Sequence, residues 1–161
     1  MQGRKALITG GTKGLGFATA KQLAAKGVDL FLAYRKDESN AKIAQATIQK
    51  EYNVNCTIFA CDLALEGQAE VLFNEVKQVF NNKLDYYVHN AAATAFKDLL
   101  ELEAHHVDKT FNLTIKSFIL GVKHAVKMME QGGAIVTVSG MDTLKAVPKH
   151  GLLGAAKAAL E

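Results

Sequence analysis

Apolar runs and amphipathic segments alternate along the chain in a regular order. Short apolar runs such as Ala6-Leu7-Ile8 are typical of buried strands, and each is followed by a segment with apolar residues at helical spacing. The predicted strands are 4–9, 28–34, 55–60, 84–89 and 133–138. The predicted helices are 15–26, about 39–52, about 66–81, about 99–129 with a break near its start, and one beginning near His150. This alternation predicts βαβ units, and therefore a parallel sheet with helices on both faces.

A glycine-rich turn joins the first predicted strand to the first predicted helix. It reads Thr-Gly-Gly-Thr-Lys-Gly-Leu-Gly over residues 9–16. Gly10 permits a tight turn, Gly14 lets the backbone approach a pyrophosphate, and Gly16 lets the helix pack close to the strand. The free N–H groups and positive dipole end of the helix favour phosphate. The candidate cofactor-binding residues of this turn are Gly10, Thr12, Lys13, Gly14, Leu15 and Gly16. The alternative, a plain turn, is weakened by the strand before it and the helix after it.

The whole chain is therefore expected to be one dinucleotide-binding domain, residues 1–161, with a doubly wound, Rossmann-like α/β fold. The predicted last helix carries Leu152, Leu153 and Leu160, and nothing follows to cover them. The fifth strand would also be left as a sheet edge. We thus expect a domain that is incomplete at the C-terminus, with its last strands missing. The last helix should be disordered, displaced or packed on a neighbouring chain.

The end of the second predicted strand bears on the choice of cofactor. It reads Ala33-Tyr34-Arg35-Lys36, without the acidic residue that would hold a free ribose 2′-hydroxyl. Arg35, together with Lys13, is able to pair with a 2′-phosphate through charge-assisted hydrogen bonds. The alternative is two solvated surface cations. The position after the strand favours the phosphate, and so NADP(H) over NAD(H).

Two further strand ends supply candidate cofactor residues. Asp62 and Leu63 follow the third strand, near where an adenine ring would sit, although an Asp after a strand is also a common helix cap. Asn90 and Ala91 follow the fourth strand. A small residue there permits close approach of a cofactor, and the Asn side chain can tie neighbouring strands. Taken without its neighbours, the Asn90 segment would be interpreted as a turn.

Composition narrows the classes of function. The chain is 49% hydrophobic and 22% charged, with a net charge of +3 that is too small and dispersed to indicate a nucleic-acid partner. No apolar stretch approaches the length of a membrane span, and the first residues do not form a signal sequence. Cys56 and Cys61 have neither CxxC spacing nor nearby His partners, so we expect free thiols and no metal site. This cysteine usage indicates a cytoplasmic protein.

Six segments together resemble the short-chain dehydrogenase/reductase family in order and spacing. They are the glycine turn, Cys61-Asp62-Leu63, Asn90-Ala91-Ala92, Phe111-Asn112-Leu113, Val138-Ser139 and Lys157-Ala158-Ala159-Leu160-Glu161. The resemblance covers the whole chain and implies a nicotinamide-dependent oxidoreductase. It places Asn112 at the family's structural and proton-relay Asn, and Ser139 near the family's Ser. Lys157 matches the Lys that binds the nicotinamide ribose.

One departure from the family pattern points to a subfamily. The common pattern has a Tyr four residues before the Lys, where this chain has Leu153. Enoyl-acyl-carrier-protein reductases place their Tyr seven residues before it, and here that residue is His150. Residues 146–161 resemble the corresponding segment of those reductases, and the glycine turn is similar to that of their NADPH-dependent third type. This resemblance implies fatty acid biosynthesis, an acyl thioester substrate on acyl carrier protein or CoA, and a homo-oligomer for the complete protein.

His150 decides between the remaining hypotheses. In enoyl reduction, negative charge develops on the thioester oxygen, and an imidazole N–H is able to donate a hydrogen bond to it. The alternative is that His150 is only a helix-start residue in a non-catalytic NADP-binding fragment or pseudoenzyme. A 3-oxoacyl reductase or another short-chain dehydrogenase is a further hypothesis, which Leu153 disfavours.

Overall fold

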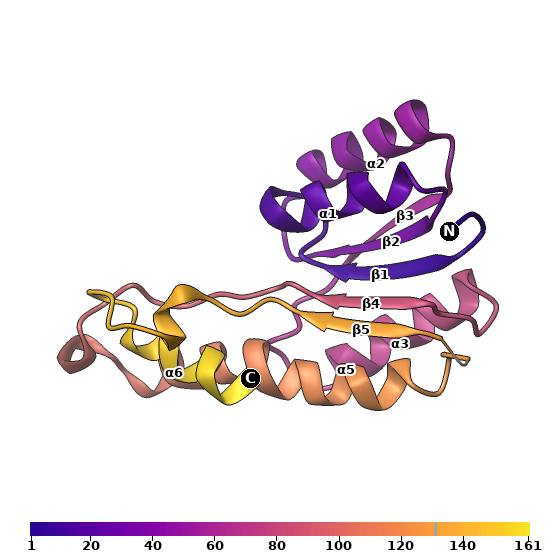
Figure 1. Cartoon of the computed structure of the whole chain (residues 1–161). Helices are drawn as coiled ribbons and strands as arrows, with labels where there is room; N and C mark the ends of the chain where they lie inside the picture. Colours follow the sequence, from indigo (N-terminus) through magenta and orange to yellow (C-terminus); the bar gives the residue numbers. More distant parts are fainter. Residues whose placement is uncertain (131) are drawn as a thin grey trace.

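In the computed structural model, which describes residues 1–130 and 132–161, five strands form one parallel sheet in the order β3-β2-β1-β4-β5 (Figure 1). The strands are β1 (Lys5–Thr9), β2 (Asp29–Tyr34), β3 (Cys56–Ala60), β4 (Tyr86–His89) and β5 (Ala134–Thr137). The chain builds outward from β1 to β3, then crosses back to place β4 on the other side of β1. The predicted doubly wound α/β fold is confirmed, and the strand order reverses between β1 and β4.

Helices cover both faces of the sheet, as predicted. Helices α1 and α2 lie on one face, and α3 and α5 lie on the other (Figure 1). The six α-helices of the described residues are α1 (Gly14–Ala24), α2 (Glu38–Tyr52), α3 (Gln68–Val79), α4 (Ala104–Phe111), α5 (Ser117–Ala125) and α6 (Gly151–Leu160). Two short 3-10 turns, η1 (Leu99–Glu101) and η3 (Met141–Thr143), lie in the loops after β4 and β5.

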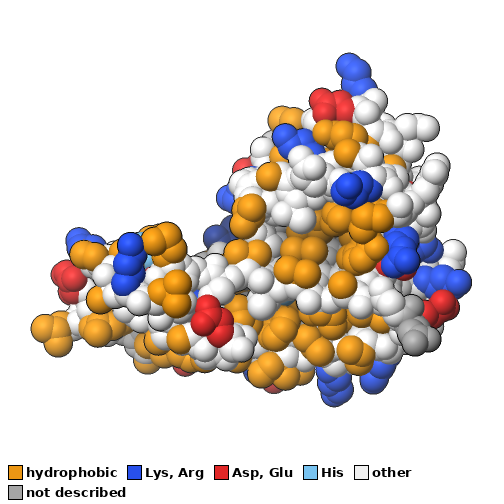
Figure 2. All heavy atoms as spheres, viewed as in Figure 1, with side chains coloured by type: hydrophobic (Ala, Val, Ile, Leu, Met, Phe, Trp, Pro, Cys, Tyr) orange, Lys and Arg blue, Asp and Glu red, His pale blue; other side chains and the backbone are white. Residues whose placement is uncertain are grey.

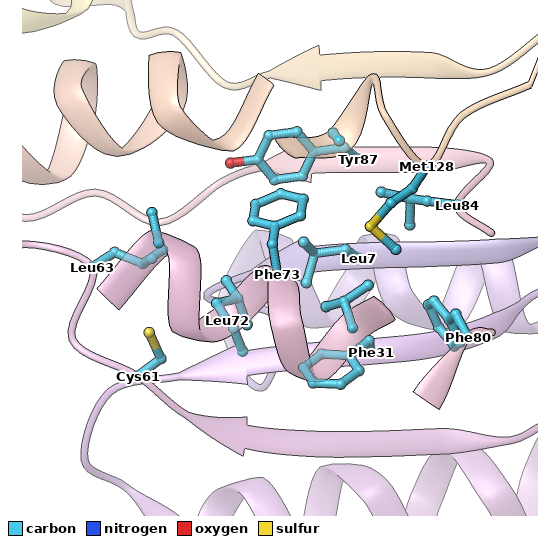
Figure 3. Close-up of a cluster of buried hydrophobic side chains, with 14 of the residues drawn as sticks. Leu7, Phe31, Cys61, Leu63, Leu72, Phe73, Phe80, Leu84, Tyr87 and Met128 are labelled. Carbon is cyan, nitrogen blue, oxygen red and sulfur yellow. The ribbon is translucent and has the colours of Figure 1, made fainter. Parts of the chain in front are cut away.

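The central strands are buried on both sides, which explains why their sequences are apolar without interruption. Ala6 and Ile8 of β1 pack in the layer beneath α1 and α2, whereas Leu7 between them packs in the opposite layer. In that opposite layer Phe73 of α3 meets Tyr87 of β4 edge to face, with ring centroids 5.4 Å apart (Figure 3). The alternation of side chains along each strand thus divides the core into two layers.

The two cysteines are free and lie in different layers of the core. Cys56 packs with the α1 and α2 layer, and Cys61 packs with the α3 and α5 layer. Burial raises the pKa of the Cys56 thiol to about 12. Burial, followed by the nearby Asp62 charge, raises the pKa of the Cys61 thiol to about 11. The prediction of free thiols is confirmed for both.

The predicted helix over 99–129 is divided differently in the structure. The break near its start is present, between η1 and α4, but the helix ends at Ala125. A π-helical segment, η2 (Asn112–Lys116), also interrupts it between α4 and α5. His89 at the end of β4 is fully buried, and its Nε2 lies 3.2 Å from the Thr114 carbonyl in this segment. Because a carbonyl only accepts, Nε2–H is the donor, and Nδ1 accepts from the Tyr87 hydroxyl at 3.1 Å. The π segment is thus attached to the sheet.

The expectation for the last helix is wrong in one respect. Helix α6 is neither disordered nor displaced: it packs against α4 and η2 of the same chain. Leu152 and Leu160 are 6% and 9% exposed and Ala156 is fully buried, while Leu153 is half-buried. The prediction looked for a covering surface only in residues after the helix, whereas the covering surface is the preceding helical layer.

The fifth strand is the sheet edge that the sequence predicts. β5 lies at the end of the strand order, and Val136 in it is 52% exposed. Beyond β4 and β5 the chain continues as two long loops that project past the rest of the sheet and carry α6 beside them (Figures 1 and 2). No described helix is both long and apolar enough to cross a membrane.

The buried His89 predicts a stability that depends on pH. Burial lowers its pKa from 6.5 to about 4, so the unfolded chain binds a proton at this group near pH 6.5 and the folded chain does not. Stability should therefore fall as the pH drops from about 6.5 to about 4, by an amount on the order of 3 kcal/mol. Urea unfolding at pH 7.5, 5.5 and 4.5 measures this loss. His89→Asn should have a smaller pH slope than the parent, and the exposed His105→Asn should not. Equal slopes in all three proteins would contradict the assignment.

Candidate active site

The glycine turn has the geometry that its sequence predicts. Gly10 has a φ of +64°, which permits the tight turn after β1. A Cβ at Gly16 would lie 2.2 Å from the Gly10 carbonyl oxygen, so only glycine allows α1 to approach the strand this closely. Gly14, with a φ of +55°, faces open space, and Leu15 beside it is 61% exposed. The start of α1 is thus open to a ligand on one side and closely packed on the other.

Asn90 joins the two strands on either side of the strand-order reversal. Its Nδ2 donates to the carbonyls of Thr9 and Gly10, at 3.0 and 3.1 Å. The Thr9 hydroxyl in turn accepts from the backbone N–H groups of Asn90 and Ala91, at 3.1 and 3.0 Å. The prediction that this Asn ties neighbouring strands is confirmed.

A cleft of about 230 Å³ lies at the carboxyl ends of β1 to β4. Seven of the predicted cofactor residues line it: Gly10, Thr12, Lys13, Arg35, Asp62, Leu63 and Ala91. Four others, Gly14, Leu15, Gly16 and Asn90, belong to the turn or the strand junction around the cleft without lining it. The cleft lies where the strand order reverses, the position at which open parallel sheets bind ligands.

Charged groups are distributed unevenly in this cleft. Lys13 lies at the N-terminus of α1, and Arg35 and Lys36 follow β2 on the same cleft. Lys13 and Arg35 are both exposed, and neither forms an ion pair with another described residue. A helix N-terminus with free N–H groups and two such cations favours an anionic, phosphate-bearing ligand. No cluster of metal ligands occurs among the described residues.

Asp62 lies in the cleft and also caps a turn. Its Oδ1 accepts from the backbone N–H of Ala64 at 3.2 Å. Helix α3 begins later, with Gly67 at its N-cap, so Asp62 is not the cap of that helix. The helix-cap alternative is therefore excluded for α3, and the Asp62 carboxylate faces a cleft of dinucleotide type.

His150 lies on a second cavity, of about 300 Å³, in the projecting loops. Its Nδ1 lies 3.3 Å from Oδ2 of Asp142, and its ring packs on Phe96 with centroids 4.7 Å apart. Its carbonyl accepts from Gly154 N–H at 2.8 Å, at the start of α6. His150 is thus a helix-start residue and, at the same time, an imidazole that faces a cavity.

Lys157 is buried about two turns farther along α6. Its Nζ donates to the carbonyl of Val138, at the end of β5. Burial lowers the pKa of this ammonium, and the negative charge of Asp142 opposes that effect. The same carboxylate therefore acts on both His150 and Lys157. Lys157 lines neither the dinucleotide cleft nor the His150 cavity.

Residues 10–161 match the family model described as enoyl-(acyl carrier protein) reductase. The chain belongs to the short-chain dehydrogenase/reductase family.

Named relatives agree with this assignment. The chain is 38% identical over 157 residues to 1-cyclohexenylcarbonyl-CoA reductase of Streptomyces collinus, covering 96% of this chain and 55% of that protein. It is 30% identical to hydroxynaphthalene reductase arp2 of Aspergillus fumigatus, over all of this chain and 58% of that protein.

Solved structures of this short-chain dehydrogenase/reductase type superpose closely. A short-chain dehydrogenase from Burkholderia cenocepacia J2315 in complex with NADP has a TM-score of 0.93 and 31% identity, covering 99% of this chain and 64% of that one. The angucycline C-6 ketoreductase LanV with bound NADP has a TM-score of 0.94 and 27% identity, covering 99% of this chain and 63% of that one. The chain therefore spans between about half and two thirds of the length of these relatives.

Two residues that the short-chain dehydrogenase/reductase resemblance assigns do not line the His150 cavity. The Ser139 hydroxyl is exposed and donates to the carboxylate of Glu161, and it lines neither cavity. Asn112 begins the π segment and faces a groove between that segment and the loop before α3. Their catalytic roles stay predictions.

The sequence analysis missed two residues that shape the site. His89 attaches the π segment that begins at Asn112, and its burial between strand and helix leaves no local motif. Asp142, in the short 3-10 turn η3, pairs with His150, and a single acidic residue in so short a turn carries no periodic signal. An acidic residue eight positions before a histidine is too common a spacing to identify a pair from sequence alone.

The close contact at Gly16 predicts a large cost of substitution. In Gly16→Ala the new Cβ would collide with the Gly10 carbonyl and with Asn90 Nδ2 at 2.6 Å, so the strand junction must shift. We expect a loss of about 3 kcal/mol in the free energy of unfolding. In the matched variant Gly14→Ala the new Cβ would contact no other atom. Only the positive φ of this residue would then lower the free energy of unfolding, by about 1 kcal/mol. Urea unfolding of both variants measures the difference, and equal losses would rule out the collision.

Proposed function

We propose that this protein reduces the 2,3 double bond of an enoyl thioester, with NADPH as the reductant. The observation that carries the proposal is the position of His150, seven residues before the buried Lys157 on a cavity of its own. That spacing matches the enoyl-acyl-carrier-protein reductases, and the family model described by that name covers residues 10–161. The named substrate of the Streptomyces relative, a cyclohexenylcarbonyl-CoA, is also an enoyl thioester.

The cleft supports NADPH as the cofactor. Gly10 and Gly16 hold the turn, and the open face at Gly14 leaves room for the pyrophosphate at the N-terminus of α1. Lys13 and Arg35 would bind the 2′-phosphate, and Asp62 and Leu63 would face the adenine. The Burkholderia and LanV structures both contain NADP. When bound, NADPH supplies a hydride to the β-carbon of the substrate and leaves as NADP⁺.

His150 would act on the thioester oxygen. As the β-carbon gains the hydride, the two electrons of the double bond shift toward that oxygen, and a proton later reaches the α-carbon to complete the saturated thioester. A donor N–H of His150 stabilises the negative charge on the oxygen during this shift. Lys157 would hold the nicotinamide ribose, as the family resemblance implies, and Ser139 and Asn112 keep their proposed supporting roles.

The relatives support a proposal for the substrate carrier. We propose an acyl-CoA or acyl-carrier-protein thioester, with a place in fatty acid or related acyl metabolism. A ketoreductase is the second candidate, because LanV reduces a ketone according to its name. Leu153 stands against it, since a half-buried leucine replaces the Tyr at the position where that reaction needs a hydroxyl donor.

Cofactor preference is tested by titration. We expect the protein to bind NADPH more tightly than NADH, because Lys13 and Arg35 pair with the 2′-phosphate. Arg35→Ala should weaken NADPH binding by about 1.5–3 kcal/mol, roughly ten- to a hundredfold, and leave NADH binding unchanged. Lys26→Ala, just beyond the C-terminal end of α1, is the control and should change neither affinity. Equal affinities of the parent for the two cofactors would overturn the NADPH preference.

Activity is tested by NADPH consumption with crotonyl-CoA and longer enoyl thioesters. We expect turnover in the parent, and little oxidation of simple alcohols. His150→Ala should reduce the rate about a hundredfold or more, because a positioned donor is lost. His105→Ala, an exposed histidine, is the control. If the parent and His150→Ala are equally inert and His150→Tyr restores turnover, the natural protein is a pseudoenzyme. An active parent matched by His150→Ala would leave His150 without a chemical role.

A further inference from the structure

The carboxylate of Asp142 is buried in the loop that faces His150. Its side chain is only 6% exposed, and Oδ2 lies 3.3 Å from His150 Nδ1. Among the described residues, no other side chain forms a hydrogen bond or ion pair with this carboxylate. Because a buried carboxylate without a partner is costly, the contact with His150 offsets its burial, together with the nearby positive charge of Lys157.

The chemistry of the two groups fixes which is the donor and which is the acceptor in the contact between His150 and Asp142. A carboxylate only accepts, so Nδ1 carries the proton that is donated to Asp142. In the neutral ring, Nε2 then holds a lone pair and has no proton to donate. A donor at Nε2 therefore requires the imidazolium form, with its positive charge beside the Asp142 carboxylate.

We propose that Asp142 is a positioning residue that holds His150 as an imidazolium, with Nε2–H free to donate to the substrate oxygen. The inference rests on the proposed function for the identity of that oxygen. A phenol, which the family pattern places here, donates as a neutral group and needs no such partner. The histidine at this position and the buried aspartate eight residues earlier thus act together as one functional pair.

Other charges face His150 from the elements packed around it. Lys97 and Asp98 come from the loop before η1, Lys149 precedes His150 in sequence, and Lys157 lies behind Asp142 on α6. The three lysines oppose a positive imidazole, and Asp98 favours it. Asp142 is the one acidic group of this set in contact with the ring, so its carboxylate is the one that interacts directly with Nδ1–H.

The first test measures His150 itself and needs no substrate. The ring nitrogens of ¹⁵N-labelled protein are followed by NMR while the pH is raised. In the parent we expect the neutral ring to keep its proton on Nδ1. In Asp142→Asn we expect a larger share of the neutral rings to carry the proton on Nε2, because an amide is able to donate to Nδ1 as well as to accept from it. Asp98→Asn, on the same cavity but without contact to the ring, should leave the proton on Nδ1. An unchanged proton position in Asp142→Asn, or the same change in Asp98→Asn, overturns the proposal.

The second test asks whether the contact between Asp142 and His150 affects the rate of turnover. With crotonyl-CoA and saturating NADPH, the parent rate should decrease as the pH rises, and Asp142→Asn should shift this decrease to lower pH. At neutral pH, kcat should fall about tenfold or more with little change in KM. Asp142→Glu should recover part of the loss. If the parent reduces no enoyl thioester, the proposed function fails, and the NMR measurement of the ring nitrogens still decides the role of Asp142. A variant with normal kcat and only reduced stability would show a merely structural aspartate.

Discussion

The junction between β1, α1 and β4 is the constraint on which the rest of the structure depends. Gly16 lies against the Gly10 carbonyl, and the Asn90 amide donates to that carbonyl and to Thr9. These contacts close the gap that opens where the strand order reverses, and they leave the N-terminus of α1 facing the cleft. A side chain on Gly16 would separate the helix from both strands. The cofactor cleft therefore depends on the close approach at Gly16 and on the Asn90 hydrogen bonds.

The projecting loops after β4 and β5 are organised by a second set of contacts. Helix α6 packs its apolar face on α4 and the π segment, and this packing buries Lys157 beside the end of β5. The π segment is itself attached to β4 through the buried His89. The sheet thus positions His150 indirectly, through helices. Since the cleft and the His150 cavity are built by different contacts, substitutions in one are expected to leave the other intact.

Local patterns in the sequence were enough to predict the sheet, the helices on both faces, the glycine turn and the strand tie by Asn90. All of these depend on residues adjacent in sequence or on strands whose order the βαβ rule dictates. The remaining features depend on distant partners. The contact of His89 with Thr114 spans 25 positions, and the partner surface of α6 lies in a helix whose π segment has no periodic signature. The Asp142 contact depends on loop conformation, which hydrophobic periodicity does not encode.

Because the two cysteines lie in different layers of the core, the opening of each layer can be followed separately. Alkylating reagents react with thiolates, and both thiols are buried with raised pKa values, so modification requires each site to open. Cys56 becomes reachable when the α2 side loosens, and Cys61 when the α3 side does. The chain contains no other cysteine. Labelling rates followed by mass spectrometry would therefore resolve whether the two halves of the sandwich open together or one at a time.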